Sequence, residues 1–284
     1  MAAWLTYLKE RFPLPVYVPL VGGFCASGAL LGGGRLAALP LAVSFIGLMV
    51  FFALLRLMDE LKDYGKDQIA HPDRPLPRGL LSTAQVEHTI RLGAVAMLAW
   101  GLCAAVLTNT SAGDAYLLVT AYLWLMYREF YCGPWLEQRP LLYALTHQLI
   151  LLPICYFCVL VFQPDLLTDP LPLYFSLCSL GAFFVYEVCR KLDPDAHPVL
   201  RTYLSVYGRS GTFVIVLLAT LVAGAGAWAL DLHRILLPVE AVLLLSLTVL
   251  WLRPGAYKIP EGLAGLSLLV HLWAIPAKSA WPAL

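Results

Sequence analysis

Nine long runs of mainly apolar residues constrain this chain more than any other feature. A helix needs roughly 20 such residues to cross the hydrocarbon core of a bilayer. Inside a bilayer, helices satisfy the backbone polar groups within the segment itself. The sequence of 284 residues therefore predicts an all-α, polytopic membrane protein with about nine transmembrane helices. The runs lie at residues 15–33, 38–57, 84–107, 113–130, 141–163, 171–189, 210–230, 235–252 and 261–277.

Composition agrees with a membrane location. Hydrophobic residues make up 60% of the chain and charged residues 13%, against roughly 45–50% and about 25% in soluble domains. The mean hydropathy is +0.76. The net charge of +1 creates no broad field that would attract nucleic acid. We therefore expect membrane lipid and no nucleic acid among the partners, and any phosphate site must be a local cluster of cations.

The basic residues predict how the chain is oriented. Suppose that the N-terminus is cytoplasmic and that each run crosses once. Then 16 of the 19 Lys and Arg residues fall in cytoplasmic loops or helix ends, and the exceptions are Arg35, Arg234 and Lys278. The positive-inside rule predicts such a bias. We expect an integral, multi-pass protein whose N-terminus and two charged loops are cytoplasmic.

The domain organisation follows from the two long charged loops, residues 58–83 and 190–209. They follow the second and the sixth run, four spans apart. This spacing predicts one transmembrane domain over residues 1–284, with possible four-helix halves at 15–130 and 141–252 and a last helix at 261–277.

The first charged loop contains three aspartates at four-residue spacing, Asp59, Asp63 and Asp67. If the preceding helix continues, the three carboxylates share one face and repel one another. Mg²⁺ would offset that repulsion, because it binds one or two carboxylates together with phosphate oxygens. The alternative is a solvated helix end in which Lys62 and Lys66 neutralise the acids.

A stiff turn follows the acidic segment. Prolines at positions 72, 75 and 77 end the helix, and Gly79 permits a tight turn. Arg74 and Arg78 would then lie close to the carboxylates, where a guanidinium can bind two phosphate oxygens at once. The alternative is that both arginines are ordinary cytoplasmic anchors.

These two motifs resemble the UbiA superfamily of intramembrane prenyltransferases. That family carries N-D-x-x-D-x-x-x-D after its second membrane helix, followed by R-P-L-P-x-G. This chain has Asp59-Glu60-Leu-Lys-Asp63-Tyr-Gly-Lys-Asp67 and then Arg74-Pro-Leu-Pro-Arg-Gly79. Asp59 replaces the opening Asn, and Glu60 replaces the next Asp, so both positions keep oxygen ligands. The resemblance implies helices arranged around a central cavity.

The second charged loop matches the family only in part. Its usual D-x-x-x-D motif and following glycine correspond here to Glu187, Lys191 and Gly208. Lys191 stands where the second acid is expected. Either Asp193 or Asp195 supplies the missing carboxylate, or Lys191 contacts the diphosphate directly. A third interpretation is a purely basic cytoplasmic loop.

The resemblance implies a reaction and a set of site residues. Departure of diphosphate from an isoprenyl diphosphate donor would leave an allylic cation, which a dry cavity protects until the acceptor attacks. The cofactor would be Mg²⁺. The expected catalytic residues are Asp59, Asp63, Asp67 and Glu187, the expected metal ligands are these four with Asp193 and Asp195, and the expected diphosphate-binding residues are Lys62, Arg74, Arg78, Lys191 and Tyr203.

The acceptor would be an aromatic, quinone-precursor-like molecule or a lipid. One alternative is a membrane terpene cyclase of the UbiA type, which acts on the prenyl diphosphate alone. Another is a membrane transporter that catalyses no reaction. A transporter would be expected to place charged residues along a path through the helices, whereas most ionisable residues here gather at one face.

Three further ionisable residues lie within or at the end of predicted spans. We interpret His147 and His271 as partners in interhelical hydrogen bonds rather than as catalytic bases. Glu129 ends the fourth span, and it either lines the cavity or pairs with Arg128.

Overall fold

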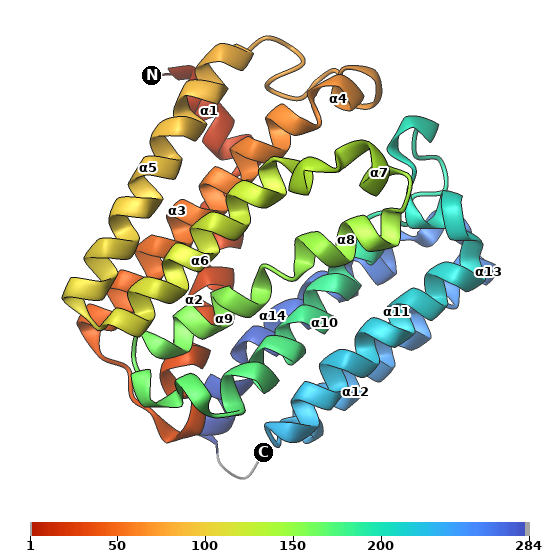
Figure 1. The fold of residues 1–284 in the computed structure, drawn as a ribbon. Coiled ribbons are helices and arrows are strands. Elements are labelled where there is room, and N and C mark those ends of the chain that lie inside the picture. Colours follow the sequence, from red (N-terminus) through yellow and green to blue (C-terminus); the bar gives the residue numbers. More distant parts are fainter. Residues whose placement is uncertain (1, 282–284) are drawn as a thin grey trace.

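The structure is a computed structural model that describes residues 2–281. In that range it contains fourteen α-helices, five short 3-10 segments and no strand (Figure 1). The helices are α1 Ala2–Arg11, α2 Leu14–Leu30, α3 Ala38–Lys62, α4 Tyr64–Ala70, α5 Thr83–Leu107, α6 Thr110–Tyr127, α7 Gly133–Glu137, α8 Pro140–Gln148, α9 Leu151–Leu160, α10 Leu171–Cys189, α11 Tyr203–Ala229, α12 His233–Ser246, α13 Val249–Leu252 and α14 Lys258–Ala280. The 3-10 segments are η1 Leu31–Gly33, η2 Glu129–Tyr131, η3 Pro164–Thr168, η4 Pro198–Leu200 and η5 Pro254–Ala256.

Polar side chains fix where several of the long helices begin. Ser82 and Gln85 form a capping box at the start of α5. The side chain of Asn109 accepts a hydrogen bond from the backbone N–H of Ala112 at the start of α6. Thr202 caps α11 in the same way. These side chains satisfy N–H groups that have no partner inside the helix.

Each of the nine apolar runs forms a helix or a pair of consecutive helices. Eight are long and apolar enough to cross a membrane, namely Leu14–Gly33, Ala38–Lys62, Thr83–Leu107, Pro140–Leu160, Leu171–Cys189, Tyr203–Ala229, His233–Leu252 and Pro254–Ala280. The ninth, α6, is 18 residues long and begins with the polar Thr110, Ser111 and Asp114. The helices also expose large apolar side chains, such as Val106 at 85% and Leu252 at 77%. Exposure of so many apolar side chains to water is unfavourable, and in a membrane lipid would cover this surface.

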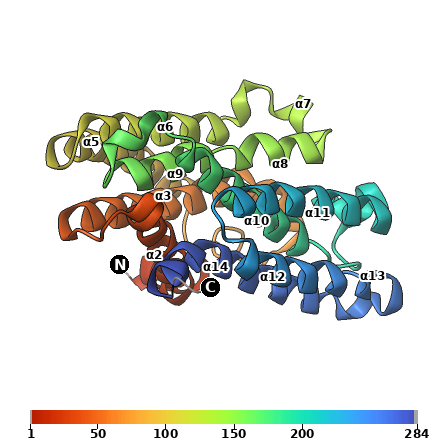
Figure 2. The ribbon, with the colours of Figure 1, turned by 90° about the horizontal axis from the view of Figure 1, so that it is seen from below.

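The membrane helices form a closed ring in chain order. Each long helix packs against the next, and α14 closes the ring by packing against both α12 and α2. Contacts of α2 with α9 and of α10 with α14 cross the middle. Yellow α5 and cyan-to-blue α11 and α12 lie at opposite sides of the bundle, whereas blue α14 lies beside red α2 (Figures 1 and 2).

Small residues permit close packing between α10 and α11. A Cβ at Gly181 would lie 2.4 Å from the backbone nitrogen of Ala223, and one at Gly226 would lie 2.5 Å from that of Cys178. Only glycine fits at these two positions. Such close approach is typical of helix pairs in membranes, where van der Waals packing replaces the hydrophobic effect.

The loops gather at two ends of the bundle. At one end, Lys66 pairs with Glu137 at 2.7 Å, and η4 contacts α4. At the other end, Gln163 donates to the carbonyl of Leu31 at 2.9 Å, and Lys278 pairs with Asp231 at 2.6 Å. The two charged loops therefore share one end, near α4 and α7 (Figure 1). The side of the membrane on which this end lies stays a prediction.

Candidate active site

The first acidic segment runs from α3 into α4 through Asp63, which lies between the two helices with φ −87° and ψ +2°. The backbone N–H groups of Asp63, Asp67 and His71 donate to the carbonyls four residues earlier, at 2.9, 2.9 and 2.8 Å. Asp59, Asp63 and Asp67 therefore lie along one face, as their spacing predicts.

The three carboxylates have different surroundings. Asp59 lies 3.5 Å from Lys62. Asp67 is buried and accepts a hydrogen bond from Arg74 at 2.6 Å. Burial, and then the negative charge of Asp59, raise the pKa of Asp63 above its usual range. Asp67 is thus already neutralised by an arginine, whereas Asp63 and Asp59 repel each other.

This arrangement fits a divalent cation held by two carboxylates. A metal at Asp59 and Asp63 would relieve the repulsion that raises the pKa of Asp63. Mg²⁺ requires one or two carboxylates when substrate phosphates complete its coordination. No group of three His, Cys, Asp or Glu side chains within residues 2–281 could hold a metal ion. The six-carboxylate ligand set expected from the sequence is therefore not assembled in this conformation.

Glu60 lies away from the other acids, although it occupies an acidic position of the family motif. It is only 2% exposed. Arg11 of α1 and Arg56 of α3 both donate to its Oε1. Glu60 therefore binds the amino-terminal helix. The expectation that it keeps a ligand oxygen in the motif does not match this placement.

The arginine loop contributes one of its two arginines to the acidic face. Gly79 has φ +77°, as the predicted tight turn requires. Arg74 lies against Asp67. Arg78 instead pairs with Glu10 of α1 at 2.8 Å and donates to the carbonyl of Asp73. The structure thus brings Arg74 to the acidic face but directs Arg78 towards α1.

The second motif is a cationic cluster built on one glutamate. Glu187, near the end of α10, pairs with Arg190 at 2.6 Å and with Lys191 at 2.5 Å. The ammonium of Lys191 also lies 5.7 Å from the ring centre of the buried Tyr203. Two positive charges surround one negative charge, so the cluster is suited to anions without a metal.

Neither aspartate of the second loop joins this cluster. Asp193 accepts a hydrogen bond from the backbone N–H of Asp195 at 2.9 Å and faces the hydroxyl of Tyr257. Asp195 is exposed. The structure therefore disfavours a replacement carboxylate from Asp193 or Asp195, while the contact of Lys191 with a diphosphate stays a prediction.

Arg190 links the two motifs and was not predicted. The carboxylate of Glu187 raises the pKa of Arg190, and Asp59 of the first motif acts in the same direction. The guanidinium therefore lies within electrostatic reach of both motifs. Its position three residues after Glu187, on the same helix face, was the available signal.

Helix α8 adds a polar cluster beside the first motif. The ammonium of Lys62 lies 5.4 Å from the ring centre of Tyr143. The hydroxyl of Tyr143 donates to Glu129 at 3.2 Å, while Arg128 lies over the ring of Tyr131. His147 bonds the carbonyl of Tyr143, one turn earlier on its own helix. The expected interhelical bond of His147 is therefore wrong.

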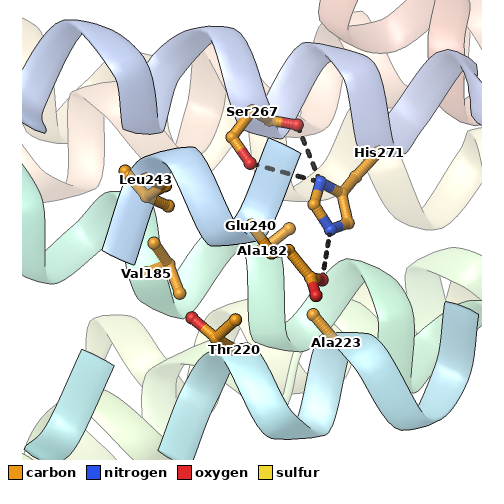
Figure 3. A pocket seen from close by; sticks show the side chains of 8 residues that line it. All are labelled: Ala182, Val185, Thr220, Ala223, Glu240, Leu243, Ser267 and His271. Carbon is orange, nitrogen blue, oxygen red and sulfur yellow. Dashed lines mark hydrogen bonds and ion pairs between the residues drawn. The ribbon is translucent and has the colours of Figure 1, made fainter. Parts of the chain in front are cut away.

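A second buried cluster connects α12 with α14 (Figure 3). Nε2 of His271 lies 3.0 Å from Oε1 of Glu240, and both residues are about 4% exposed. The expected interhelical bond of His271 is therefore confirmed. The cavity beside this pair, which Thr220 and Ser267 also line, has a volume of about 10 Å³, comparable to the space of one water molecule.

Comparison with known proteins finds similarity at the level of structure. No protein-family model and no curated protein sequence matches the chain. The solved apo structure of a UbiA homologue from Aeropyrum pernix K1 matches with a TM-score of 0.64 and 16% identity, over 95% of this chain and 99% of that one. A structure of digeranylgeranylglyceryl phosphate synthase matches with a TM-score of 0.62 and 15% identity, over 96% and 99% of the two chains.

The likeness covers almost the whole of each chain, so it concerns the complete helix bundle and not a shared fragment. At identities of 15–16% it is a likeness of fold. The chain is a multi-pass, all-helical protein with the UbiA fold.

Proposed function

We propose that this chain is an intramembrane prenyltransferase of the UbiA superfamily. It would transfer an isoprenyl group from a prenyl diphosphate to an aromatic acceptor of the quinone-precursor kind, in a reaction that depends on Mg²⁺. The observation that carries the proposal is the pairing of motifs at one end of the bundle. Asp59, which acts on its neighbour Asp63, also lies within electrostatic reach of Arg190, which belongs to the cationic cluster on α10.

Asp59 and Asp63 would hold the metal. When bound, Mg²⁺ would neutralise the charge that develops on the departing diphosphate. Asp67 has another task, since its ion pair with Arg74 fixes a guanidinium next to the acidic face. We therefore assign Asp67 to the positioning of Arg74.

The diphosphate oxygens would bind Arg190, Lys191 and Arg74. Glu187 holds the first two of these cations in place through short ion pairs. Tyr203 supports the ammonium of Lys191 by a cation–π contact. The side chains of Arg190 and Lys191 are long and flexible, and these contacts would hold both cations in position to bind the diphosphate.

An aromatic column extends from this site into the bundle. Tyr17 lies within reach of the charges of Asp59 and Arg190. Its ring centre is 5.9 Å from that of Phe52, and Phe24 lies beyond Phe52 at 6.5 Å and stacks with Phe183 at 5.5 Å. Such rings can stabilise a carbocation by cation–π attraction and exclude water from it.

The test uses purified protein with a labelled prenyl diphosphate, with and without aromatic acceptors. We expect Mg²⁺-dependent release of diphosphate and a prenylated product. Asp63→Asn should lower turnover by about 100-fold or more, because the loss of about 3 kcal/mol of metal-assisted stabilisation corresponds to that factor. Asp195→Asn, in an exposed turn, is the matched control and should retain activity.

Two outcomes would overturn the proposal. Cyclised products formed from the donor alone would identify a terpene cyclase. Absence of diphosphate release with every donor tried, together with movement of a solute across vesicles, would identify a transporter.

A further inference from the structure

The fifth membrane span is broken at its middle. Helix α8 ends at Gln148, and α9 begins at Leu151. Just before the break, the carbonyl of Thr146 accepts a hydrogen bond from the hydroxyl of Tyr122 on α6, at 2.7 Å. Leu149 and Ile150 keep right-handed helical dihedrals. Pro153 accounts for the interruption, because it lacks the backbone N–H that would donate to the carbonyl of Leu149.

His147 precedes this break, and its hydrogen bond fixes where its proton lies. Nδ1 is 2.7 Å from the carbonyl oxygen of Tyr143. A carbonyl can only accept, so Nδ1 carries the hydrogen. In the neutral ring, Nε2 is then an unprotonated acceptor. Nε2 is buried and has no hydrogen-bond partner among the described residues. A buried polar atom without a partner is unfavourable and calls for an explanation.

The chemistry of Nε2 specifies the group that would satisfy it. A lone pair on a neutral imidazole requires a donor, such as a hydroxyl, and is not satisfied by a carboxylate or a hydrocarbon. The charged residues that act on the ring are Lys62 and Asp59 of the first motif and Glu187 of the second. His147 therefore lies within electrostatic reach of both motifs of the candidate active site.

A strained turn covers this histidine. Glu129, Phe130 and Tyr131 have φ of +48°, +53° and +58°, a left-handed conformation that side chains with a Cβ disfavour. The ring of Phe130 meets that of His147 edge-on, with centres 5.5 Å apart. Gly133 accommodates the turn, because a Cβ there would lie 2.0 Å from the carboxylate of Glu129. Backbone strain of this kind gathers at functional sites.

We propose that Nε2 of His147 accepts the proton of a hydroxyl-bearing acceptor and that Phe130 covers this atom until the acceptor binds. The inference rests on the function proposed above. It narrows the acceptor to molecules that present a hydroxyl at the helix break, beside Tyr122, Tyr143 and Thr146.

The bond between the allylic carbon and the diphosphate oxygen breaks, and its electron pair leaves with the diphosphate. The O–H bond of the acceptor breaks, and the proton moves to Nε2. The electron pair released from that bond supports formation of the new bond between the allylic carbon and a ring carbon conjugated with the oxygen. The hydrogen on that ring carbon then moves to the oxygen, which restores the aromatic ring and the hydroxyl, so that the net products are the prenylated acceptor, the diphosphate and the proton on Nε2.

The experiment compares an acceptor that has a free hydroxyl with its methyl ether. The variant His147→Phe keeps an aromatic ring next to Tyr143 and Phe130 but removes the lone pair. The variant His147→Gln keeps an acceptor oxygen but cannot take up the proton. His88→Gln, on the exposed surface of α5, is the matched control. Thermal unfolding shows that each variant is folded.

We expect wild type to prefer the free hydroxyl by about 100-fold in kcat/KM. His147→Phe should lose this preference. His147→Gln should keep KM for the acceptor within about threefold and lower kcat by about 100-fold, a split that a purely structural role would not produce.

The possible failures are distinguishable. If wild type transfers the prenyl group and His147→Phe keeps both the rate and the hydroxyl preference, the inference about His147 is wrong and the proposed function stands. If His147→Phe does not fold, an unchanged kcat in His147→Gln overturns the inference in the same way. If wild type releases no diphosphate from any donor, the proposed function and this step fall together.

Discussion

Asp59 and Glu60 are neighbours in the chain and have opposite surroundings. Asp59 lies on the acidic face, while Glu60 is buried against Arg11, which is 49 residues away in the sequence. The four-residue spacing of the aspartates predicts their common face, because it follows from helix geometry alone. The partner of Glu60 depends on where α1 packs, and residue spacing carries no information about that.

The ion pairs of Glu187 could have been predicted more fully. Arg190 and Lys191 follow it by three and four residues, the spacing at which helical side chains meet. The family motif has an acid where this chain has Lys191, so the motif alone does not predict two cations at this position. The result is a cluster of two cations on one carboxylate, which we propose binds the diphosphate.

At the residue scale, we predict that Asp63→Asn stabilises the protein when Mg²⁺ is absent. The pKa of Asp63 is raised in the folded state, so its ionisation disfavours folding. This penalty is absent below the ordinary carboxyl pKa of about 4 and is complete once the pH exceeds the raised pKa. The gain should be about 0.5 kcal/mol, measured by thermal unfolding in detergent with EDTA at pH 7.5.

At pH 4 the two proteins should have nearly equal midpoints. Addition of Mg²⁺ at pH 7.5 should stabilise only wild type and remove the advantage of the variant. A stabilisation of Asp63→Asn that persists with Mg²⁺ would contradict the assignment of Asp63 as a metal ligand.

At the scale of elements, two helices are joined by a buried pair that shares one proton. Nδ1 of His271 bonds the carbonyl of Ser267 at 2.8 Å and therefore carries a hydrogen. One further proton lies between Nε2 and Glu240, so the pair is neutral whether it is an acid with an imidazole or a carboxylate with an imidazolium. It connects α12 with α14, the helix that closes the ring.

We predict that His271→Leu is much more damaging than Glu240→Gln. The amide of a glutamine can donate to Nε2 of the neutral ring, so the pair stays satisfied. Removal of the histidine leaves Glu240 buried without its partner, which should reduce stability by about 3 kcal/mol or more. Unfolding in denaturing detergent measures both variants. The double variant Glu240→Leu with His271→Leu should recover much of the loss, and equal effects of the two single variants would contradict this account.

At the scale of the whole molecule, sequence predicted the nine helices and the common end of the charged loops. Both follow from the bilayer, which imposes a length on each span and a bias on the charge of each loop. Other features depend on packing in three dimensions. They include the closure of the ring by α14 against α2 and the breaks after Gln148 and Ser246.

The orientation of the molecule gives a further prediction. In a background with Cys103→Ser and Cys132→Ser, which removes the two cysteines that are not buried, a membrane-impermeant thiol reagent should label Asp165→Cys in intact cells. His197→Cys should react only after the membrane is permeabilised, because its loop lies at the end that carries most of the basic residues. The reverse pattern would place the candidate active site outside the cell.

The amino-terminal helix reaches two parts of this end at once. Arg11 bonds Glu60 on α3, and Glu10 pairs with Arg78 on the loop that follows α4. A phosphate that attracted Arg78 would have to separate it from Glu10, and would thereby remove one of the two ion pairs that seat α1 on the bundle. Binding of an anion at the loop and the docking of α1 are in that case thermodynamically linked, so that each weakens the other by the same factor.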